Sequence, residues 1–276
     1  MRHFAILAFA CLSLAAAPFR AASASETIPP EIVQRLMESD VVILGEVHDN
    51  PLHHLVQTEA VELLQPKAVV WEMLTEEGAA RITQKAISDP EKLAEVLKWA
   101  EMGWPPLAMY LPVFAASSGA PVYGAMVPRE AAKAAMEAGP ATAMGADAAR
   151  YGLTIPLPPE EQAAREADQQ ASHCNAMPPE MLPNLVAIQR LRDAVLTRAI
   201  RQAIAETGGP VAVITGNGHA RKDRGIPTFL SRMEPGLRVF ALGQSEGGAI
   251  EGDFDAVIDS PAAEREDPCA TFLKEG

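Results

Sequence analysis

The chain has 276 residues, enough for one large domain or two small ones with a substantial core. Apolar residues make up 48% and charged residues 21%, as is usual in globular proteins. Because 36 acidic residues stand against 23 basic ones, the formal charge is −13, and the absence of a basic run argues against nucleic acid as a partner.

The N-terminus has the pattern of an export signal. Arg2 gives a positive start, the apolar stretch at 4–17 is too short to span a bilayer comfortably, and "ASA" at 22–24 fits a cleavage site. We therefore expect a signal peptide at 1–24 and one α/β domain with a helical lid at 25–276, located in the periplasm or exported. A lipoprotein acylated at Cys11 is the less favoured alternative, because Ala8 stands where such a signal normally has Leu.

Six apolar segments have the character of strands, and most are separated by helical patterns. Continuous apolar runs such as "VVIL" indicate strands that are buried on both faces, as in a parallel sheet. In chain order, the expected strands are 41–44, 68–73, 120–126, 210–215, 236–242 and 254–259. The expected helices are 29–39, 51–65, 78–87, 90–100, 107–117, 128–139, 159–173 and 180–206.

This alternation predicts an α/β fold with a mostly parallel sheet flanked by helices. Residues 140–160 show no clear period, and the region from about 140 to 206 interrupts the alternation. We interpret that region as a helical insertion. Cys174 and Cys269 remain after removal of the signal, and in an oxidising compartment they predict one disulfide, with two unpaired thiols as the alternative.

Titratable side chains gather where the expected strands end. The stretch "GEVHDNPLHH" at 45–54 follows the first strand and holds three of the six histidines. Ligands of parallel sheets bind at the carboxyl ends of the strands, so we expect these groups to share one site. Its expected members come from three strand ends: Glu46, His48, Glu72 and His219.

Two imidazoles and two carboxylates could ligate a divalent transition metal that activates water for hydrolysis. Without a metal, the same groups suit general acid–base chemistry. There are also purely structural interpretations: one or both of His53 and His54 could serve the fold alone, and Glu72 could simply pair with an arginine.

These residues resemble a known family. "GEVHDNPLHH", "WEM", "PVYGAMVPR", "LRDAVL" and "GNGHARKDRGIP" are similar to the ChaN-like haem-binding family of the Tiki and erythromycin-esterase superfamily. The resemblance implies an α/β fold with a helical insertion and a centre formed by the Glu46, His48, Glu72 and His219 cluster. It also implies roles for Arg129, and for Arg192 with Asp193, near the pocket. The family often has Asn where this chain has Met126, and its members are often lipoproteins, for which this signal lacks a convincing lipobox.

The resemblance further implies haem as the cofactor and a part in iron uptake, with an outer-membrane haem receptor and a second copy of the chain as expected partners. No Cys-x-x-Cys-His motif is present, which argues against covalent attachment. The candidate axial ligands are Tyr110, Tyr151 and His173. Tyr110 ranks first only because it precedes Pro112 beside the "GWPP" break, which we interpret as a cleft edge; for this residue a packed aromatic with its hydroxyl satisfied is the favoured interpretation. Tyr151 and His173 could simply be surface residues.

Three functions follow from this sequence. The first is an exported, non-catalytic haem-binding protein, and we favour it. The second is a metal-dependent hydrolase of peptidase or esterase type that uses the Glu46, His48, Glu72 and His219 cluster. The third is an interaction module in which these groups only hold loops together.

Overall fold

The structure, a computed structural model, describes residues 27–267 and 269–272. A six-stranded sheet forms its centre, with strand order β3-β2-β4-β1-β5-β6. Every neighbouring pair is parallel, which confirms the predicted α/β class and the six strands. The strands are β1 (Val41–Glu46), β2 (Ala68–Trp71), β3 (Val122–Gly124), β4 (Val211–Gly216), β5 (Val239–Glu246) and β6 (Ala256–Ser260).

Successive residues of the central strands enter two different hydrophobic cores. In β1, Val42 and Leu44 belong to one core, whereas Val41 and Ile43 belong to the other. This follows from the two-residue period of a strand, which sends neighbouring side chains to opposite faces. The continuous apolar runs of the sequence are therefore explained by a sheet that is covered on both faces.

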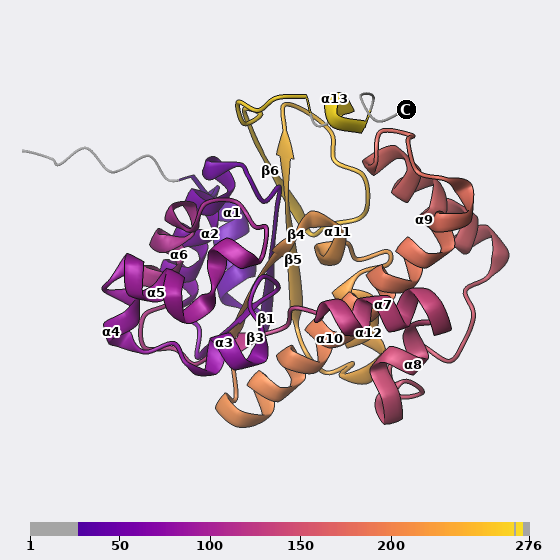
Figure 1. Cartoon of the computed structure of the whole chain (residues 1–276). Helices are drawn as coiled ribbons and strands as arrows, with labels where there is room; N and C mark the ends of the chain where they lie inside the picture. Colours follow the sequence, from indigo (N-terminus) through magenta and orange to yellow (C-terminus); the bar gives the residue numbers. More distant parts are fainter. Residues whose placement is uncertain (1–26, 268, 273–276) are drawn as a thin grey trace, which may run out of the picture.

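The N-terminal half of the chain supplies the first covering layer (Figure 1). The predicted helix at 78–87 is in fact two short helices, because Thr83 caps a new helix by accepting a hydrogen bond from the Ala86 amide. This layer contains α1 (Pro30–Met37), α2 (Pro51–Leu64), α3 (Glu76–Ala80), α4 (Gln84–Ile87), α5 (Pro90–Leu97), α6 (Leu111–Ala116) and the 3-10 helices at Trp99–Glu101 and Leu107–Met109.

The second layer contains the helical insertion and lies on the other side of the sheet in Figure 1. Its elements are α7 (Arg129–Ala138), α8 (Pro140–Met144), α9 (Pro159–Ser172), α10 (Leu182–Thr207), α11 (Asn217–Ala220), α12 (Ile226–Met233) and the 3-10 helices at Gly145–Asp147 and Pro179–Met181. Helix α10 has two roles. Its Leu191 and Ala194 pack in a separate core of the insertion, whereas Ile200 and Ala203 pack on the sheet.

The central strands β1 and β4 send their connections to opposite faces of the sheet. Helix α2 follows β1 and packs in the first core, whereas α12 follows β4 and packs in the second. In parallel α/β sheets such a reversal opens a crevice at the carboxyl ends of the two strands, and ligands bind there. The fold therefore places the crevice at Glu46 and Gly216, which are partners in the β1–β4 register.

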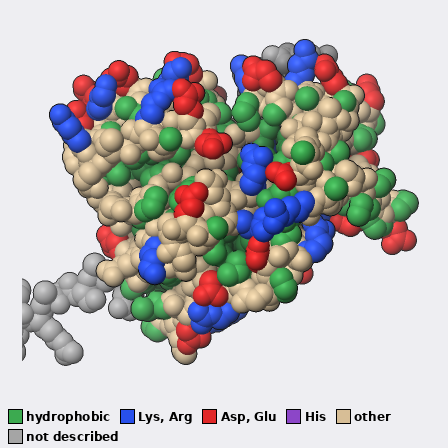
Figure 2. Space-filling model, turned by 90° about the horizontal axis from the view of Figure 1, so that it is seen from below, with side chains coloured by type: hydrophobic (Ala, Val, Ile, Leu, Met, Phe, Trp, Pro, Cys, Tyr) green, Lys and Arg blue, Asp and Glu red, His purple; other side chains and the backbone are tan. Residues whose placement is uncertain are grey.

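The surface shown in Figure 2 carries charges of both signs. On the face that Figure 2 shows, acidic and basic side chains are interspersed and form no broad basic surface. No helix within the described ranges is long and apolar enough to cross a membrane.

The predicted disulfide between Cys174 and Cys269 is present, and it joins the end of α9 to α13 (Cys269–Phe272). The predicted signal peptide lies outside the described residues.

The disulfide predicts a measurable loss of stability when it is removed. It joins cysteines 95 residues apart, and the loop-entropy model gives about 4–5 kcal/mol for a loop of that length. We expect Cys174→Ser to lower the thermal midpoint under oxidising conditions, and Cys269→Ser to lower it by the same amount. Dithiothreitol should bring the wild type down to the variants without changing them. Equal midpoints for all three oxidised proteins would contradict this expectation.

Candidate functional site

The four residues expected to form one site do lie together at the carboxyl ends of β1, β2 and β4. Glu46 ends β1, Glu72 follows β2 directly, and His219 lies in α11 just after β4. The His48 Nε2 atom lies 3.9 Å from Glu72 Oε2, and His219 Nε2 lies 3.4 Å from Glu72 Oε1. This convergence depends on β4, which separates β1 from β2 in the sheet.

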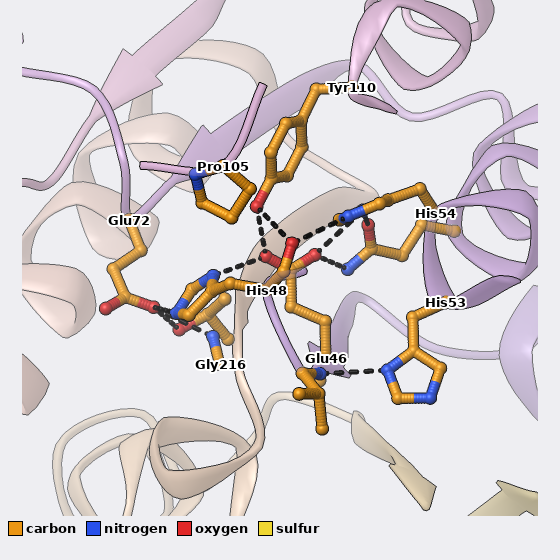
Figure 3. A network of polar contacts seen from close by, with 12 residues as sticks. Glu46, His48, His53, His54, Glu72, Pro105, Tyr110 and Gly216 are labelled. Carbon is orange, nitrogen blue, oxygen red and sulfur yellow. Dashed lines mark hydrogen bonds and ion pairs between the residues drawn. The ribbon is translucent and has the colours of Figure 1, made fainter. Parts of the chain in front are cut away.

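The Glu46 carboxylate is buried and has four polar contacts (Figure 3). Its Oε1 atom accepts a hydrogen bond from the Tyr110 hydroxyl at 3.0 Å and contacts His48 Nδ1 at 2.6 Å. Its Oε2 atom accepts from the Gln57 amide at 2.6 Å and lies 3.2 Å from His54 Nδ1. Burial raises the pKa of a carboxyl group, but the two histidines outweigh it and lower the pKa of Glu46.

His54 is held in its charged form by the acceptors around it. Its Nε2 lies 3.0 Å from the His48 carbonyl oxygen, and its Nδ1 faces oxygens of Glu46 and Gln57. Since only acceptors surround the ring nitrogens, both must donate. Burial lowers the pKa of this ring, but Glu46 reverses the effect and raises it.

His53 is different. It accepts a hydrogen bond from the Val47 amide at Nδ1, and its burial lowers its pKa. Its Nε2 atom lies 3.3 Å from the Ser245 carbonyl oxygen, so the neutral ring links the loop after β1 to β5. A structural role explains His53 fully.

A second buried chain of charges runs from β2 to α10. Glu72 Oε2 accepts hydrogen bonds from the Thr215 hydroxyl and the Gly216 amide, each at 2.8 Å. Its other oxygen faces His219, whose Nδ1 lies 2.7 Å from Asp193 Oδ1. Burial lowers the pKa of His219, but the two carboxylates outweigh it and raise the pKa to about 10. Burial tends to raise the pKa of Glu72, but His219 and its other partners hold it well below its usual range.

His48 is the most exposed side chain of the cluster, with 29% of its side-chain surface accessible. It lies between the two buried acids, and its ring packs against Trp104 with the ring centres 4.9 Å apart. Burial of most of the ring lowers its pKa, but Glu46 and Glu72 outweigh this and raise it. His48 is therefore the group through which the buried network meets solvent.

The arrangement gives no support to a metal centre. Within the described ranges, no group of three or more His, Cys, Asp or Glu side chains is placed to hold a metal ion. The Glu46 oxygens are already engaged by four side chains, and Asp193 occupies the Nδ1 side of His219.

A cavity of about 380 Å³ opens beside this network, and we call it the strand-end cavity. It contains both arginines expected near the pocket, Arg129 and Arg192, together with Glu72. Its lining residues are Glu72, Glu101, Met102, Gly103, Trp104, Ala125, Met126, Val127, Arg129 and Arg192. A second cavity of about 730 Å³, the helical cavity, adjoins it and shares Met126 and Val127.

The arginines of these cavities have no partners within the chain as described. Of the fourteen arginines that the structure describes, ten bond to a carboxylate or a backbone carbonyl. The four without a hydrogen bond or ion pair to any described residue are Arg129, Arg150, Arg192 and Arg198. Arg129 and Arg192 line the strand-end cavity, and Arg198 lines the helical cavity. Three of the four arginines without a described partner thus line the two cavities.

The residues expected to bind the haem iron do not line the strand-end cavity. Tyr110 does not lie at a cleft edge. It is wholly buried, and its hydroxyl lies 3.0 Å from Glu46 Oε1 and 3.2 Å from the His48 carbonyl oxygen, which agrees with the alternative interpretation of a packed aromatic. The short 3-10 helix at Leu107–Met109 turns it inward, where it packs against His54 and Trp71. His173 follows α9, and its Nδ1 lies 2.7 Å from the Gln169 carbonyl. Tyr151 is buried in the core of the insertion and is not a surface residue. None of the three candidate ligands lines the strand-end cavity, and their role as iron ligands stays a prediction.

Sequence reasoning missed several groups that complete the site. Gln57 and Tyr110 bind Glu46, and Trp104 stacks on His48. Only Gln57 leaves a signal: it lies three residues after His54 in a predicted helix, on the same face. Trp104 belongs to the "GWPP" break. Tyr110 lies in the helix predicted at 107–117, which in the structure is a 3-10 helix at Leu107–Met109 followed by α6, and the helical pattern gives no signal for its contact with Glu46.

The raised pKa of His219 predicts how stability depends on pH. The folded pKa of about 10 exceeds the unfolded value of about 6.5, so the stabilisation is complete below pH 6.5 and is lost as the pH rises towards 10. We expect the thermal midpoint to fall between pH 7 and 10, and His219→Gln to reduce this slope. His173→Gln, outside the network, serves as the control and should keep the wild-type slope. Parallel profiles for the wild type and His219→Gln would contradict the assignment.

The fold resembles that of known structures. ChaN of Campylobacter jejuni, solved in a study of cofacial haem binding, superposes with a TM-score of 0.61 at 20% identity, covering 82% of this chain and 89% of that one. The type III effector HopBA1 gives a TM-score of 0.47 at 16% identity, covering 84% and 92%. A Bacillus cereus protein gives 0.38 at 14%, covering 78% and 68%. No curated protein matches the sequence.

The model of one protein family matches the sequence itself. Its description is "Haem-binding uptake, Tiki superfamily, ChaN", and the match covers residues 32–230. That span includes β1 to β4, the helical insertion, and all the residues of the Glu46 and Glu72 networks. The chain therefore belongs to the ChaN haem-binding uptake family of the Tiki superfamily, as the sequence motifs indicated.

Proposed function

We propose that this protein binds haem in the strand-end cavity and takes part in haem or iron uptake. The observation that carries the proposal is the pair of unpartnered arginines, Arg129 and Arg192, at one cavity that also has an apolar wall. Haem needs both features, since it is a flat apolar macrocycle with two propionate groups. Guanidinium groups bind carboxylates through two parallel hydrogen bonds.

The side chains that line the strand-end cavity suit haem as a ligand. Trp104, Met102, Met126 and Val127 offer aromatic and thioether surface for the macrocycle. The Trp104 Nε1 atom is buried without a hydrogen-bond partner, which leaves an unused donor in the wall. The volumes of both cavities lie in the range that small-molecule sites usually have, roughly 300–1,000 Å³. When bound, haem would supply the iron; the chain would supply the apolar slot and the positive charge.

Family membership supports the proposal, since ChaN of Campylobacter jejuni is a protein with cofacial haem binding. Export to the periplasm, transfer to an outer-membrane haem receptor and formation of a homodimer belong to the same proposal. The export signal at 1–24 lies outside the described residues.

A haemin titration of the mature protein tests this function. We expect a Soret band that saturates with the wild type, and an affinity about tenfold weaker in the Arg129→Gln, Arg192→Gln double variant, because two exposed ion pairs contribute about 0.5–1 kcal/mol each. Arg150→Gln is the matched control, since Arg150 is also unpartnered but lines neither cavity. Equal affinity for the double variant and the control would exclude this cavity as the site, and no spectral change with the wild type would exclude the function.

A second candidate function is hydrolysis, and the Glu46–His48 pair is the observation that favours it. The buried Glu46 carboxylate lies 2.6 Å from His48 Nδ1 and orients the ring. The other ring nitrogen, Nε2, lies 3.9 Å from Glu72 Oε2, and the His48 side chain is partly exposed. A histidine held in this way suits general acid–base chemistry on a bound water. The geometry supports this version of the hydrolase hypothesis more than the version with a metal.

A model ester, such as p-nitrophenyl acetate, tests the second candidate. If His48 acts as the base, His48→Gln should lower the hydrolysis rate by at least about 100-fold, the usual contribution of a positioned general base. His173→Gln should leave the rate unchanged. A rate in His48→Gln equal to that of the wild type would remove the hydrolase hypothesis for this centre, and metal analysis of the same samples would test the metal version.

A further inference from the structure

We propose that a further cavity, which we call the α9 cavity, binds a small zwitterion with the charges of an amino acid. The α9 cavity has a volume of about 330 Å³ and shares no lining residue with the strand-end cavity or the helical cavity. Its volume is at the lower end of the range that small-molecule sites usually have, roughly 300–1,000 Å³. The cavity therefore suits a ligand smaller than a porphyrin, and the proposal does not depend on haem binding.

One face of α9 forms a polar wall of this cavity. Its lining residues are spaced by three and four positions, so they lie on the same side of the helix: Arg165, Asp168, Gln169 and Ser172. The rest of the lining comes from α10, from α11 and the segment after it, and from the loop between β5 and β6. The cavity is therefore bounded by segments that lie far apart in the sequence.

Four charged side chains at the cavity pair with one another. Asp168 Oδ2 lies 3.0 Å from Arg221 Nη1 and 2.7 Å from Arg224 Nη1. Asp223 binds the same two arginines, at 2.7 Å from Arg221 Nη2 and 3.2 Å from Arg224 Nε. These two guanidinium groups and two carboxylates compensate one another, so a ligand must be recognised mainly by the remaining charges.

Arg165 is buried but keeps one donor nitrogen unused. The residue is only 7% exposed, and its Nε and Nη2 atoms both contact the same Glu161 oxygen, at 3.0 and 2.5 Å. The Nη1 atom has no partner among the described residues and retains accessible surface. Because a largely buried guanidinium donor without an acceptor is costly, this group favours a ligand carboxylate.

Glu251 provides the opposite charge from the loop between β5 and β6. Its exposed carboxylate has no hydrogen bond or ion pair to any residue that the structure describes. The loop itself is held in place, because the Lys222 amide donates to the Asp253 carbonyl at 2.8 Å. Gly252 also packs on Arg221 so closely that a Cβ atom would lie 2.4 Å from Nε. The loop thus presents an unpaired carboxylate to the cavity, which suits a ligand ammonium group.

The two unpaired groups lie at separate points of the cavity. Arg165 is one helical turn from Asp168 on α9, whereas Glu251 adjoins the glycine that packs on Arg221. The Asp168–Arg221 ion pair therefore links the two positions. A ligand with one carboxylate and one ammonium group matches both of them. A simple anion would leave Glu251 unpaired, and a simple cation would leave the Arg165 donor unused.

Calorimetric titration of the protein with the common amino acids, each added alone, tests the proposal. We expect at least one to bind the wild type, and its N-acetyl derivative and its amide to bind more weakly, since each lacks one of the two charges. Arg165→Gln should weaken binding about tenfold or more, because a largely buried charged hydrogen bond is lost. Glu251→Gln should weaken it only about threefold, because this contact is exposed.

The derivatives separate ligand contacts from a structural role. Arg165→Gln should bind the amino acid and its amide with equal affinity, and Glu251→Gln should bind the amino acid and its N-acetyl derivative with equal affinity. Glu31→Gln on α1, outside the three named cavities, is the matched control and should behave as the wild type. A thermal scan without ligand checks that each variant is folded.

Failure of this proposal can be distinguished from failure of haem binding. The Arg129→Gln, Arg192→Gln double variant should bind the amino acid as the wild type does, and a loss there would place the ligand in the strand-end cavity and overturn the proposal. Binding of no amino acid by the wild type would also overturn it. If Arg165→Gln does not fold, Glu251→Gln decides the matter, since an unchanged preference for the amino acid over its N-acetyl derivative would exclude the α9 cavity as the site.

Discussion

The burial of the Glu46 carboxylate is the constraint on which the rest of the site depends. A charge without access to water is costly unless donors replace its hydration. Here the donors come from three parts of the chain: His48 in the loop after β1, Gln57 and His54 in α2, and Tyr110 before α6. The positions of α2 and α6 on the sheet are thus tied to one carboxylate, and His48, the exposed member, receives its orientation from the same contact.

Strand order turns this local network into a site. Because β4 lies between β1 and β2, Glu46 and Glu72 flank its carboxyl end from opposite sides. The glycine at that end permits a close approach, since a Cβ at Gly216 would lie 3.0 Å from His48 Nε2. The turn that follows brings His219 back against Glu72 and Asp193. Residues far apart in the sequence meet here only through this insertion of one strand.

The fold and the four central residues could be predicted because both follow from local patterns. Buried parallel strands are continuous apolar runs, and polar groups after such runs must gather at one edge of the sheet. The partners of those residues could not be predicted, since they depend on strand order and on irregular segments. Tyr110 shows the difference: the sequence predicts one helix at 107–117, whereas the structure has a short 3-10 helix at its start that turns the ring inward towards Glu46. Likewise, the pairing of Asp193 with His219 requires knowing that α10 packs against β2 and β4.

Glu72 belongs to both the buried network and the strand-end cavity, and this has an electrostatic consequence. A lone carboxylate in the cavity wall would repel an anionic ligand. Here His219 carries a positive charge between Glu72 and Asp193, and hydrogen bonds from Thr215 and Gly216 spread the charge of Glu72 further. The neutralisation acts over a few ångströms in a poorly solvated region, where such interactions are strong. The remaining charges of the lining are those of Arg129, Arg192 and the exposed Glu101, which sum to a net positive charge. The buried histidine therefore makes the cavity more favourable for the proposed anionic ligand without lining the cavity itself.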